Sequence, residues 1–535
     1  MAVLVLLPVF LLAAGAGGVA YIAAFRPGFR STWLVVAGVA LLAWAAVLGL
    51  RWLLPDPLVI PTWLPLGVPE ANELRLVMDQ VSWPYALSLT ALLNAVVLTG
   101  AVRLTPGASP WPWAGMLGLA SMSLLAILAG SPLALLITWT AIDLVDLVVV
   151  ALLSDSQRLS RQAVIAFSTR ATGTVLVVAA MITSLSAGEA LTFDNVQPLA
   201  AVFLLAAAGL RLGVLPLNLP YTQILPIRRD LGTLLRFAAP ASSLPLLARL
   251  PAGALPEGIQ GPALGFALLA CLYGAAMWLA AEDGLAGRPF WLVSLAGLAV
   301  AATLLGSPLA SIAWGVALLL SGGMIFLYST RLKGILLVGA LSGLALSGLP
   351  FTPSASGWVG LAGGGFDPVQ IAFVLTVAML LAGFIRHLSG PVEEVARFER
   401  WIGVVYPLGL LVLPLNQWIF PLLSYRGALT MGVWWASLAA VLLSVGILAL
   451  ILRRRQQVEG LATSWLGEIA RRAGLALAAF FRLDWLYRVL WAGYQGLQGL
   501  AALVRSLLEG QGGVIWALVL LSLLVSLINL GVEPR

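Results

Sequence analysis

Charged residues are scarce in this sequence. Of 535 residues only 10% are charged, whereas 61% are hydrophobic and the mean hydropathy is +1.02. A soluble domain carries about 25% charged residues, so this composition excludes a soluble fold. Apolar runs long enough to cross a bilayer as helices recur along the whole chain. The composition therefore predicts an all-α polytopic membrane protein.

Cysteine, lysine and histidine are almost absent. The only ones are Cys271, Lys333 and His387, so 28 of the 29 basic residues are arginine. One cysteine excludes a disulfide framework and any cysteine-based iron–sulfur or zinc site. The formal net charge of +7 does not indicate nucleic-acid binding, because the arginines gather at the ends of apolar runs. His387 follows Arg386 at such an end and is expected at the membrane interface.

The hydrophobic runs predict about sixteen transmembrane helices, each near the roughly 20 residues that a spanning helix needs. The first run lacks a basic stretch before it and a small-residue cleavage site, so we expect a span there and not a secretory signal. The spans are expected near residues 2–25, 31–54, 83–104, 111–130, 132–153, 162–185, 198–217, 231–250, 262–281, 289–306, 308–329, 334–352, 368–388, 401–421, 428–452 and 513–531.

The connections between spans alternate in charge. One set is rich in arginine, with Arg26, Arg103, Arg158 and Arg453 among its members, whereas the other holds acidic residues such as Glu189. Because basic loops stay in the cytoplasm, the arginine-rich set is expected inside and the N-terminus outside. We expect a cytoplasmic membrane of a prokaryote.

Two spans are interrupted by proline and glycine. The elements that interrupt them are Pro216, Asn218 and Pro220 in span 7, and Gly348, Pro350 and Pro353 in span 12. The two spans lie five apart and so run in opposite directions, which is typical of inverted repeats with broken helices in transporters. Two ordinary proline kinks are the alternative.

This pattern predicts a domain organisation. It consists of N-terminal helices over 1–104, a first five-helix repeat over 111–250, a second over 262–388 and two further helices over 401–452. Residues 453–512 alternate arginine with Leu, Ala, Phe and Trp, which indicates an amphipathic lateral segment along the membrane surface. A last helix is expected over 513–531.

Five charged residues fall inside spans or at their inner third, where charge is costly and usually functional. They are the candidates for an ion pathway: Asp143, Asp146, Arg170, Arg211 and Arg236. At about 1.5 Å of helical rise per residue, Asp146 and Arg170 both lie roughly 10–14 Å deep, which favours an ion pair. Asp143, on the same helix face, is then expected to pair with Arg211. The alternative is that these pairs only lock three helices together.

A series of motifs resembles the antiporter-like subunits of respiratory complex I, Mrp-type cation/proton antiporters and membrane-bound hydrogenases. Asp79-Gln-Val-Ser82 is similar to the family's Asp-x-Leu-Ser signature, and Arg211 with Pro216 resembles its Lys-x4-Pro in broken helix 7. Leu234-Leu-Arg236 is similar to the family's Leu-Leu-His of helix 8. Gly348-Leu-Pro350 followed by Gly357-Trp358 resembles its broken helix 12, and Asp484-Trp-Leu-Tyr487 resembles the tail of the larger members.

The sequence departs from the family where the resemblance would place its proton-carrying residues. The helix 5 glutamate falls near Thr140, the helix 7 lysine is replaced by Arg211, and the titratable residues of helices 11 and 12 have no counterpart. A buried lysine can release its proton, whereas arginine stays protonated in proteins. The sequence therefore disfavours a lysine-based relay of the family type, and Asp143 and Asp146 remain the titratable groups of the core.

The resemblance implies a membrane subunit of a complex I- or Mrp-like assembly, contributing to proton or cation translocation coupled to a redox partner. Its partners would be other membrane subunits and lipid, with no nucleic acid. The chain holds no flavin, iron–sulfur, nucleotide or metal motif, so no cofactor and no catalytic site of its own are expected. Two alternatives are a non-conducting structural subunit of such an assembly and a stand-alone secondary transporter of a small solute. The sequence leaves open the ion, its direction and any role of quinone.

Overall fold

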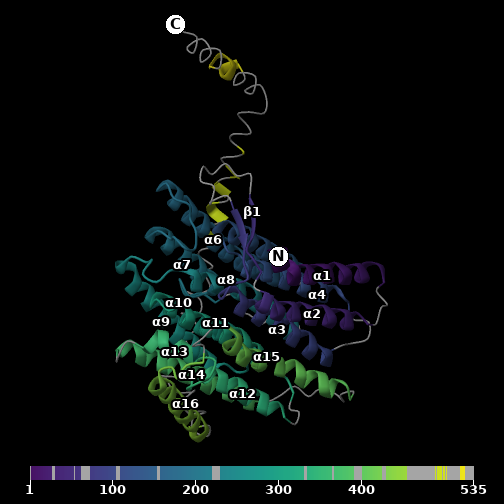
Figure 1. The fold of residues 1–535 in the computed structure, drawn as a ribbon, viewed down its shortest axis with the longest axis vertical. Helices are drawn as coiled ribbons and strands as arrows, with labels where there is room; N and C mark the ends of the chain where they lie inside the picture. Colours follow the sequence, from purple (N-terminus) through teal and green to yellow (C-terminus); the bar gives the residue numbers. More distant parts are fainter. Residues whose placement is uncertain are drawn as a thin grey trace. The chain divides into compact units, whose positions relative to one another are not determined.

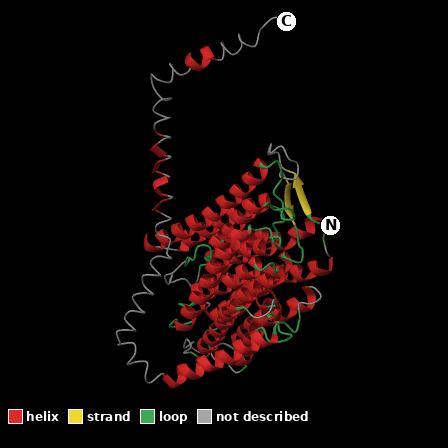
Figure 2. Ribbon diagram, turned by 90° about the vertical axis from the view of Figure 1, so that its left-hand side faces the viewer, coloured by secondary structure: helices red, strands yellow, loops and turns green. Residues whose placement is uncertain are grey.

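Long helices with short connections make up most of the chain (Figures 1 and 2). The computed structural model describes residues 2–26, 31–53, 55–61, 73–103, 109–153, 157–219, 229–330, 334–363, 367–390, 400–424, 429–454 and short pieces between 488 and 523. By contacts along the chain it divides into two units, Met1–Arg482 and Leu483–Arg535. All elements named below lie in the first unit.

The first half of this unit begins with the 3₁₀ turn η1 (Ala2–Leu6), which leads directly into helix α1. Its helices are α1 (Leu7–Phe25), α2 (Thr32–Leu53), α3 (Ser82–Gly100), α4 (Trp111–Ile127), α5 (Pro132–Leu153), α6 (Gln157–Ser186), α7 (Pro198–Leu212) and α8 (Arg229–Arg249). A 3₁₀ turn, η3 (Ala101–Arg103), extends α3. Several of these helices begin with proline at their first turn, where its missing N–H costs no hydrogen bond.

The second half continues in the same manner. Its helices are α9 (Glu257–Ala280), α10 (Arg288–Leu304), α11 (Pro308–Leu327), α12 (Ile335–Ser347), α13 (Ala355–Ala362), α14 (Pro368–Ser389), α15 (Ile402–Ser424) and α16 (Trp434–Arg454). Helix α9 packs on α10 and α14, and α15 returns to pack on α3. Small residues permit such close contacts, since a Cβ at Gly274 of α9 would lie 2.7 Å from the carbonyl oxygen of Phe290.

The prediction of an all-α polytopic membrane protein is confirmed. Within the described residues, eleven helices are long and apolar enough to cross a membrane, and four shorter apolar helices accompany them. These fifteen helices coincide with the first fifteen predicted spans. The lateral segment 453–512 and the last helix 513–531 fall almost entirely outside the described residues, and the predictions for them stay untested.

A short β-hairpin between α2 and α3 was not expected from the sequence. Strands β1 (Leu58–Pro61) and β2 (Glu73–Leu76) pair antiparallel, with Leu58 opposite Leu76. Backbone hydrogen bonds from Val77 to Leu128 and from Gly130 to Arg75 attach the hairpin to the end of α4. These residues lie outside the hydrophobic runs on which the prediction rested.

The predicted interruption of span 7 is confirmed, although the helix ends earlier than residue 217. Helix α7 stops at Leu212 because Gly213 adopts a left-handed conformation with φ of +79°. Asn218 stabilises the break, since its side-chain amide donates to the carbonyl oxygens of Leu210 and Pro216, each at 3.2 Å. Pro220 lies outside the described residues.

Span 12 is also broken and extends further than the predicted boundary at residue 352. Helix α12 ends at Ser347, the chain turns through Gly348, Pro350 and Pro353, and the half-helix α13 follows to Ala362. Gly348 has a φ of +67°, and a Cβ there would lie 2.4 Å from the indole ring of Trp358. Both breaks fit the predicted pair of discontinuous helices, and the inverted repeat that would relate them stays a prediction.

Candidate functional site: a buried arginine–aspartate network

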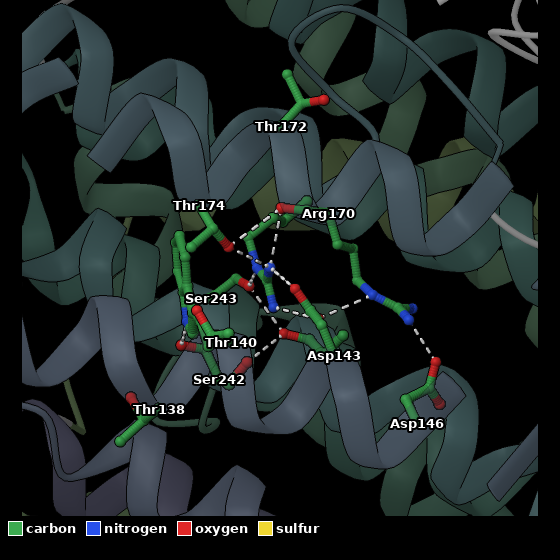
Figure 3. A network of polar contacts seen from close by, with 12 residues as sticks. Thr138, Thr140, Asp143, Asp146, Arg170, Thr172, Thr174, Ser242 and Ser243 are labelled. Atoms are coloured by element: carbon green, nitrogen blue, oxygen red, sulfur yellow. Dashed lines mark hydrogen bonds and ion pairs between the residues drawn. The ribbon is translucent and has the colours of Figure 1, made fainter. Parts of the chain in front are cut away.

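Four charged side chains meet in the apolar interior between α5, α6 and α7 (Figure 3). Asp143 and Asp146 come from α5, Arg170 from α6 and Arg211 from α7. Each residue is no more than 5% exposed. Aspartates three residues apart share one face of a helix, which is why both carboxylates point toward the neighbouring helices.

Arg211 and Asp143 form the central pair, as the sequence predicts. Nη1 of Arg211 lies 2.6 Å from Oδ2 of Asp143, and Nη2 lies 2.9 Å from Oδ1. This bidentate arrangement is the strongest form of arginine–carboxylate contact, because both N–H groups of the planar fork are used.

Arg170 connects the two aspartates. Its Nη2 donates to Oδ2 of Asp146, which confirms the second predicted pair. Its Nε also lies 3.0 Å from Oδ1 of Asp143. The sequence predicted two separate ion pairs, whereas the structure joins them into one chain in the order Arg211, Asp143, Arg170 and Asp146. Two positive and two negative charges make this chain neutral.

Neutral groups complete the environment of Arg211. Its Nε donates to the hydroxyl oxygen of Ser243 on α8 at 3.2 Å, and its Nη1 donates to the backbone carbonyl oxygen of Arg170 at 3.2 Å. The guanidinium lies 4.2 Å from the centre of the Trp139 ring. Cation–π contacts of this kind strengthen when water is excluded. Arg211 of α7 is therefore held by residues of three other helices, α5, α6 and α8.

Close approach of α6 and α7 makes room for this arginine. A Cβ at Gly173 would lie 2.8 Å from Cγ of Arg211 and 3.0 Å from the carbonyl oxygen of Ala207. Any larger residue at this position would push α6 away from α7. Glycine here allows α6 and α7 to approach each other closely beside Arg211.

Two other residues singled out in the sequence do not join the network. Arg236 is half-buried near the start of α8, where its Nη1 donates to the carbonyl oxygen of Gly232 at 3.0 Å. Thr140 is exposed, and its hydroxyl donates to the carbonyl oxygen of Leu136 one turn earlier. The position of Arg236 along its helix did not show that it lies outside the network, because packing decides which groups a side chain contacts.

The second half of the unit is filled with aromatic side chains. Trp278, Trp291, Phe326 and Phe384 contact one another between α9, α10, α11 and α14, and Trp314 packs edge-on against Trp358 at 5.9 Å. Among the described residues, no charged side chain lies midway along α9 to α13. The half-buried His387 contacts Trp278 near the end of α14, and its Nε2 lies 3.0 Å from the carbonyl oxygen of that residue.

Asp79, the first residue of the Asp-x-x-Ser motif, lies just before α3 and outside the membrane-spanning helices. It accepts hydrogen bonds from Nη1 of Arg249 at 2.8 Å and from the backbone N–H of Ser82 at 2.8 Å. Burial opposes ionisation of Asp79, but the Arg249 guanidinium and the Ser82 hydrogen bonds outweigh it and hold the pKa of the carboxyl below its usual range. The pair connects the start of α3 to the end of α8.

Sequence reasoning missed several residues of the site. Ser243, Trp139 and Gly173 carry no charge and do not stand out from the other small and aromatic residues of apolar runs. Arg288, which directly precedes the predicted span at 289–306, was not singled out from the sequence and is 4% exposed at the start of α10. No group of three or more histidine, cysteine or acidic side chains in the described part of the chain is arranged to hold a metal ion.

Fold and site together define an integral membrane protein of many helices, two of them interrupted, with a neutral network of buried charges in its first half. The sequence matches no family profile and no curated relative. Its fold, in contrast, is that of chains in solved structures of an Mrp complex and of two respiratory complexes, which confirms the fold that the sequence motifs imply.

Three solved structures illustrate the likeness. A chain of the Mrp complex from Dietzia sp. DQ12-45-1b superposes with a TM-score of 0.66 at 18% identity over 92% of this chain. This chain spans only 62% of that one. A chain of the membrane-bound sulfane sulfur reductase, an archaeal respiratory membrane complex, gives 0.65 at 15% identity, covering 98% of this chain and 99% of that chain. A chain of respiratory complex I from Thermus thermophilus gives 0.60 at 17% identity, covering 83% and 99%.

Proposed function

We propose that this chain is a membrane subunit of a complex I- or Mrp-like assembly and contributes to proton or cation translocation there. The observation that carries the proposal is the buried chain of Arg211, Asp143, Arg170 and Asp146. Charges so deep in a membrane protein are costly, and they are typical of proton and ion pathways. The three solved chains with the same fold are parts of multi-subunit membrane complexes, which supports a role within an assembly.

The chemistry of the network falls to its carboxylates. Arginine does not release its proton in a protein, so Arg170 and Arg211 act as fixed positive charges. Protonation of Asp143 would remove one negative charge and leave a net charge of +1 on a network that is otherwise neutral. This excess positive charge would favour movement of an arginine side chain, entry of water into the network, or loss of a proton from another group. A proton at Asp143 is thereby coupled to the geometry of α6 and α7.

A second candidate is a structural subunit that has kept the fold without conducting. The aromatic packing of α9, α10, α11 and α14 favours it, because tryptophan and phenylalanine rings offer no hydrogen-bonded route for a proton. In this case the four charges serve to lock α5, α6 and α7 in register.

The same proposal implies which partners carry the redox chemistry and in which membrane the chain lies. Any redox chemistry would belong to partner subunits, and the chain would contribute no cofactor. The proposed location is the cytoplasmic membrane of a prokaryote, with the N-terminus outside because arginine-rich connections stay in the cytoplasm. A stand-alone transporter of a small solute is the remaining alternative.

Proton or cation flux in proteoliposomes tests this function. The native assembly would be reconstituted with wild-type chain, Asp143→Asn, or Asp194→Asn as a control at an exposed loop position. We expect flux to fall in Asp143→Asn and to be unchanged in the control, with subunit content verified for each. Wild-type flux in an intact Asp143→Asn assembly contradicts the relay and favours the structural subunit.

The assembly itself is tested by purification. Extraction of the chain from its own membrane in mild detergent should retain other multi-spanning subunits, identified by mass spectrometry. A chain that purifies alone and transports an organic solute would support the stand-alone transporter instead.

A further inference from the structure

A second group of charges lies outside the network, at the start of α8 and α10 and the end of α3. It consists of Arg103, Arg229, Arg236 and Arg288, which we call the arginine cluster. Arg288 lies within electrostatic range of the other three arginines and of Asp283. The proposed function makes no use of this cluster. Its helix ends are among those expected on the cytoplasmic side of the membrane.

Arg288 is the buried centre of the cluster. It is 4% exposed, and its Nη2 donates to the backbone carbonyl oxygen of Arg229 at 3.3 Å. Its guanidinium lies 5.5 Å from the centre of the Phe326 ring, and its Nε has no hydrogen-bond partner. Within the described part of the chain, no carboxylate comes within 4 Å of this guanidinium. In the network, by contrast, both buried arginines have a carboxylate at contact distance.

The surroundings of Arg288 add positive charge. Arg229 donates to the carbonyl oxygens of Phe326 at 3.3 Å and Tyr328 at 2.7 Å, at the end of α11. Counted over the described residues named here, the four arginines together with Asp230 and Asp283 carry a net charge of +2. Arg103, Arg229 and Arg236 are half-buried, so part of each side chain is accessible, whereas Arg288 is buried.

A buried cation without a counter-charge is strongly unfavourable unless a ligand compensates for it. A planar guanidinium fork fits the oxygens of a phosphate group, which can accept several charge-assisted hydrogen bonds at once. Basic pockets between transmembrane helices at the cytoplasmic side are suited to anionic lipid headgroups.

We propose that the arginine cluster binds a phosphate group, supplied by the headgroup of an anionic phospholipid or by free phosphate, with Arg288 as its buried contact. The bound phosphate bridges α8, which carries Ser243 of the network, to α10 and to the end of α11. It therefore fixes the position of the helix that supports Arg211 against the second half of the unit.

Thermal unfolding of the full chain in detergent, or of its assembly, tests the proposal. Phosphatidylglycerol is compared with phosphatidylcholine at equal concentration, and sodium phosphate with sodium chloride at equal ionic strength. We expect phosphatidylglycerol to raise the Tm more than phosphatidylcholine does. Arg288→Gln should abolish that difference, whereas Arg26→Gln, at an exposed position on the same expected side, should retain it. A rise with sodium phosphate as well identifies free phosphate as a sufficient ligand, and a rise with lipid alone identifies the headgroup.

Native mass spectrometry of the wild-type chain gives a measurement that does not depend on folding of the Arg288 variant. It should detect bound phosphatidylglycerol or phosphate that survives at detergent conditions which remove phosphatidylcholine. Arg236→Gln, at the half-buried edge of the cluster, should weaken this binding about tenfold, the effect expected when one charge-assisted hydrogen bond is lost. Equal retention of both lipids with no bound phosphate, or an unchanged preference in Arg288→Gln, overturns the proposal.

Discussion

At the scale of single residues, Asp143 and Asp146 differ in their ion pairs, although both are aspartates on the same helix about one turn apart. Asp143 contacts two arginines, with Oδ2 at 2.6 Å from Arg211 and Oδ1 at 3.0 Å from Arg170. Asp146 forms its ion pair with Arg170. Loss of the Asp143 charge therefore exposes two buried cations to each other.

This difference predicts an order of stability for two variants. Asp143→Asn should lower the free energy of unfolding by about 3–5 kcal/mol, the range for removing one partner of a buried ion pair. Asp146→Asn should cost less, because Arg170 retains its contact with Asp143. Thermal or denaturant unfolding of the purified variants measures both, with the exposed Asp194→Asn as control. Equal losses in the two variants would mean that Asp143 does not bridge the arginines.

At the scale of elements, the two helix breaks depend on glycine conformations as much as on proline. Proline predicts where a helix is interrupted, since it lacks the N–H and clashes with the preceding turn. The structure shows that α7 and α12 end at Gly213 and Gly348, before the first proline of each motif is reached. The glycines therefore fix the end of each helix, and the prolines follow in the turn.

Gly348→Ala should destabilise the chain. The new Cβ would lie 2.4 Å from the Trp358 ring at a φ of +67°, and overpacking together with a left-handed alanine costs about 2–4 kcal/mol. Gly446→Ala is the matched control, because its Cβ meets no atom within 4 Å in the middle of α16. Unfolding in detergent would compare them, and equal midpoints for the two variants would show that the turn tolerates a side chain.

The Asp79–Arg249 contact predicts a pH dependence. The pKa of Asp79 is lower in the folded chain than in the unfolded chain, so the unfolded chain binds this proton more readily. The stability that the pair contributes is present above the ordinary carboxyl pKa of about 3.9 and is lost as the pH falls through the lower, folded pKa. Asp79→Asn should reduce the dependence of Tm on pH below about 4, compared with Asp194→Asn. A Tm that falls with acid equally steeply in both variants would contradict a contribution from Asp79.

At the scale of the whole molecule, the predicted orientation of the chain in the membrane can be tested by labelling introduced cysteines. The sequence has a single cysteine to remove first. Cys271 has no exposed surface, so it should not react with a membrane-impermeant maleimide in the folded chain. In a Cys271→Ala background, Arg26→Cys and Glu189→Cys introduce exposed thiols at two connections of opposite predicted side. In intact cells Glu189→Cys should be labelled and Arg26→Cys should not. The reverse labelling would invert the predicted orientation.

The sequence by itself determined the class of the protein, the places of fifteen of its apolar helices, and one arginine partner each for Asp143 and Asp146. Apolar length, proline and depth along a helix are local properties, and a helix that crosses a membrane has few ways to place an internal charge. Helix ends were less predictable, because the positive φ of Gly213 and Gly348 cannot be read from the sequence.

Only the tertiary structure decided how the helices face one another. It joined the two ion pairs through Arg170, brought Ser243 and Trp139 to Arg211, and left Arg236 outside the network. It also buried Arg288 near other arginines at the start of α10, a residue that the sequence did not single out. These contacts join residues tens of positions apart, and their geometry depends on the rotation of each helix and on close approaches such as that at Gly173. No local pattern in the sequence encodes those rotations.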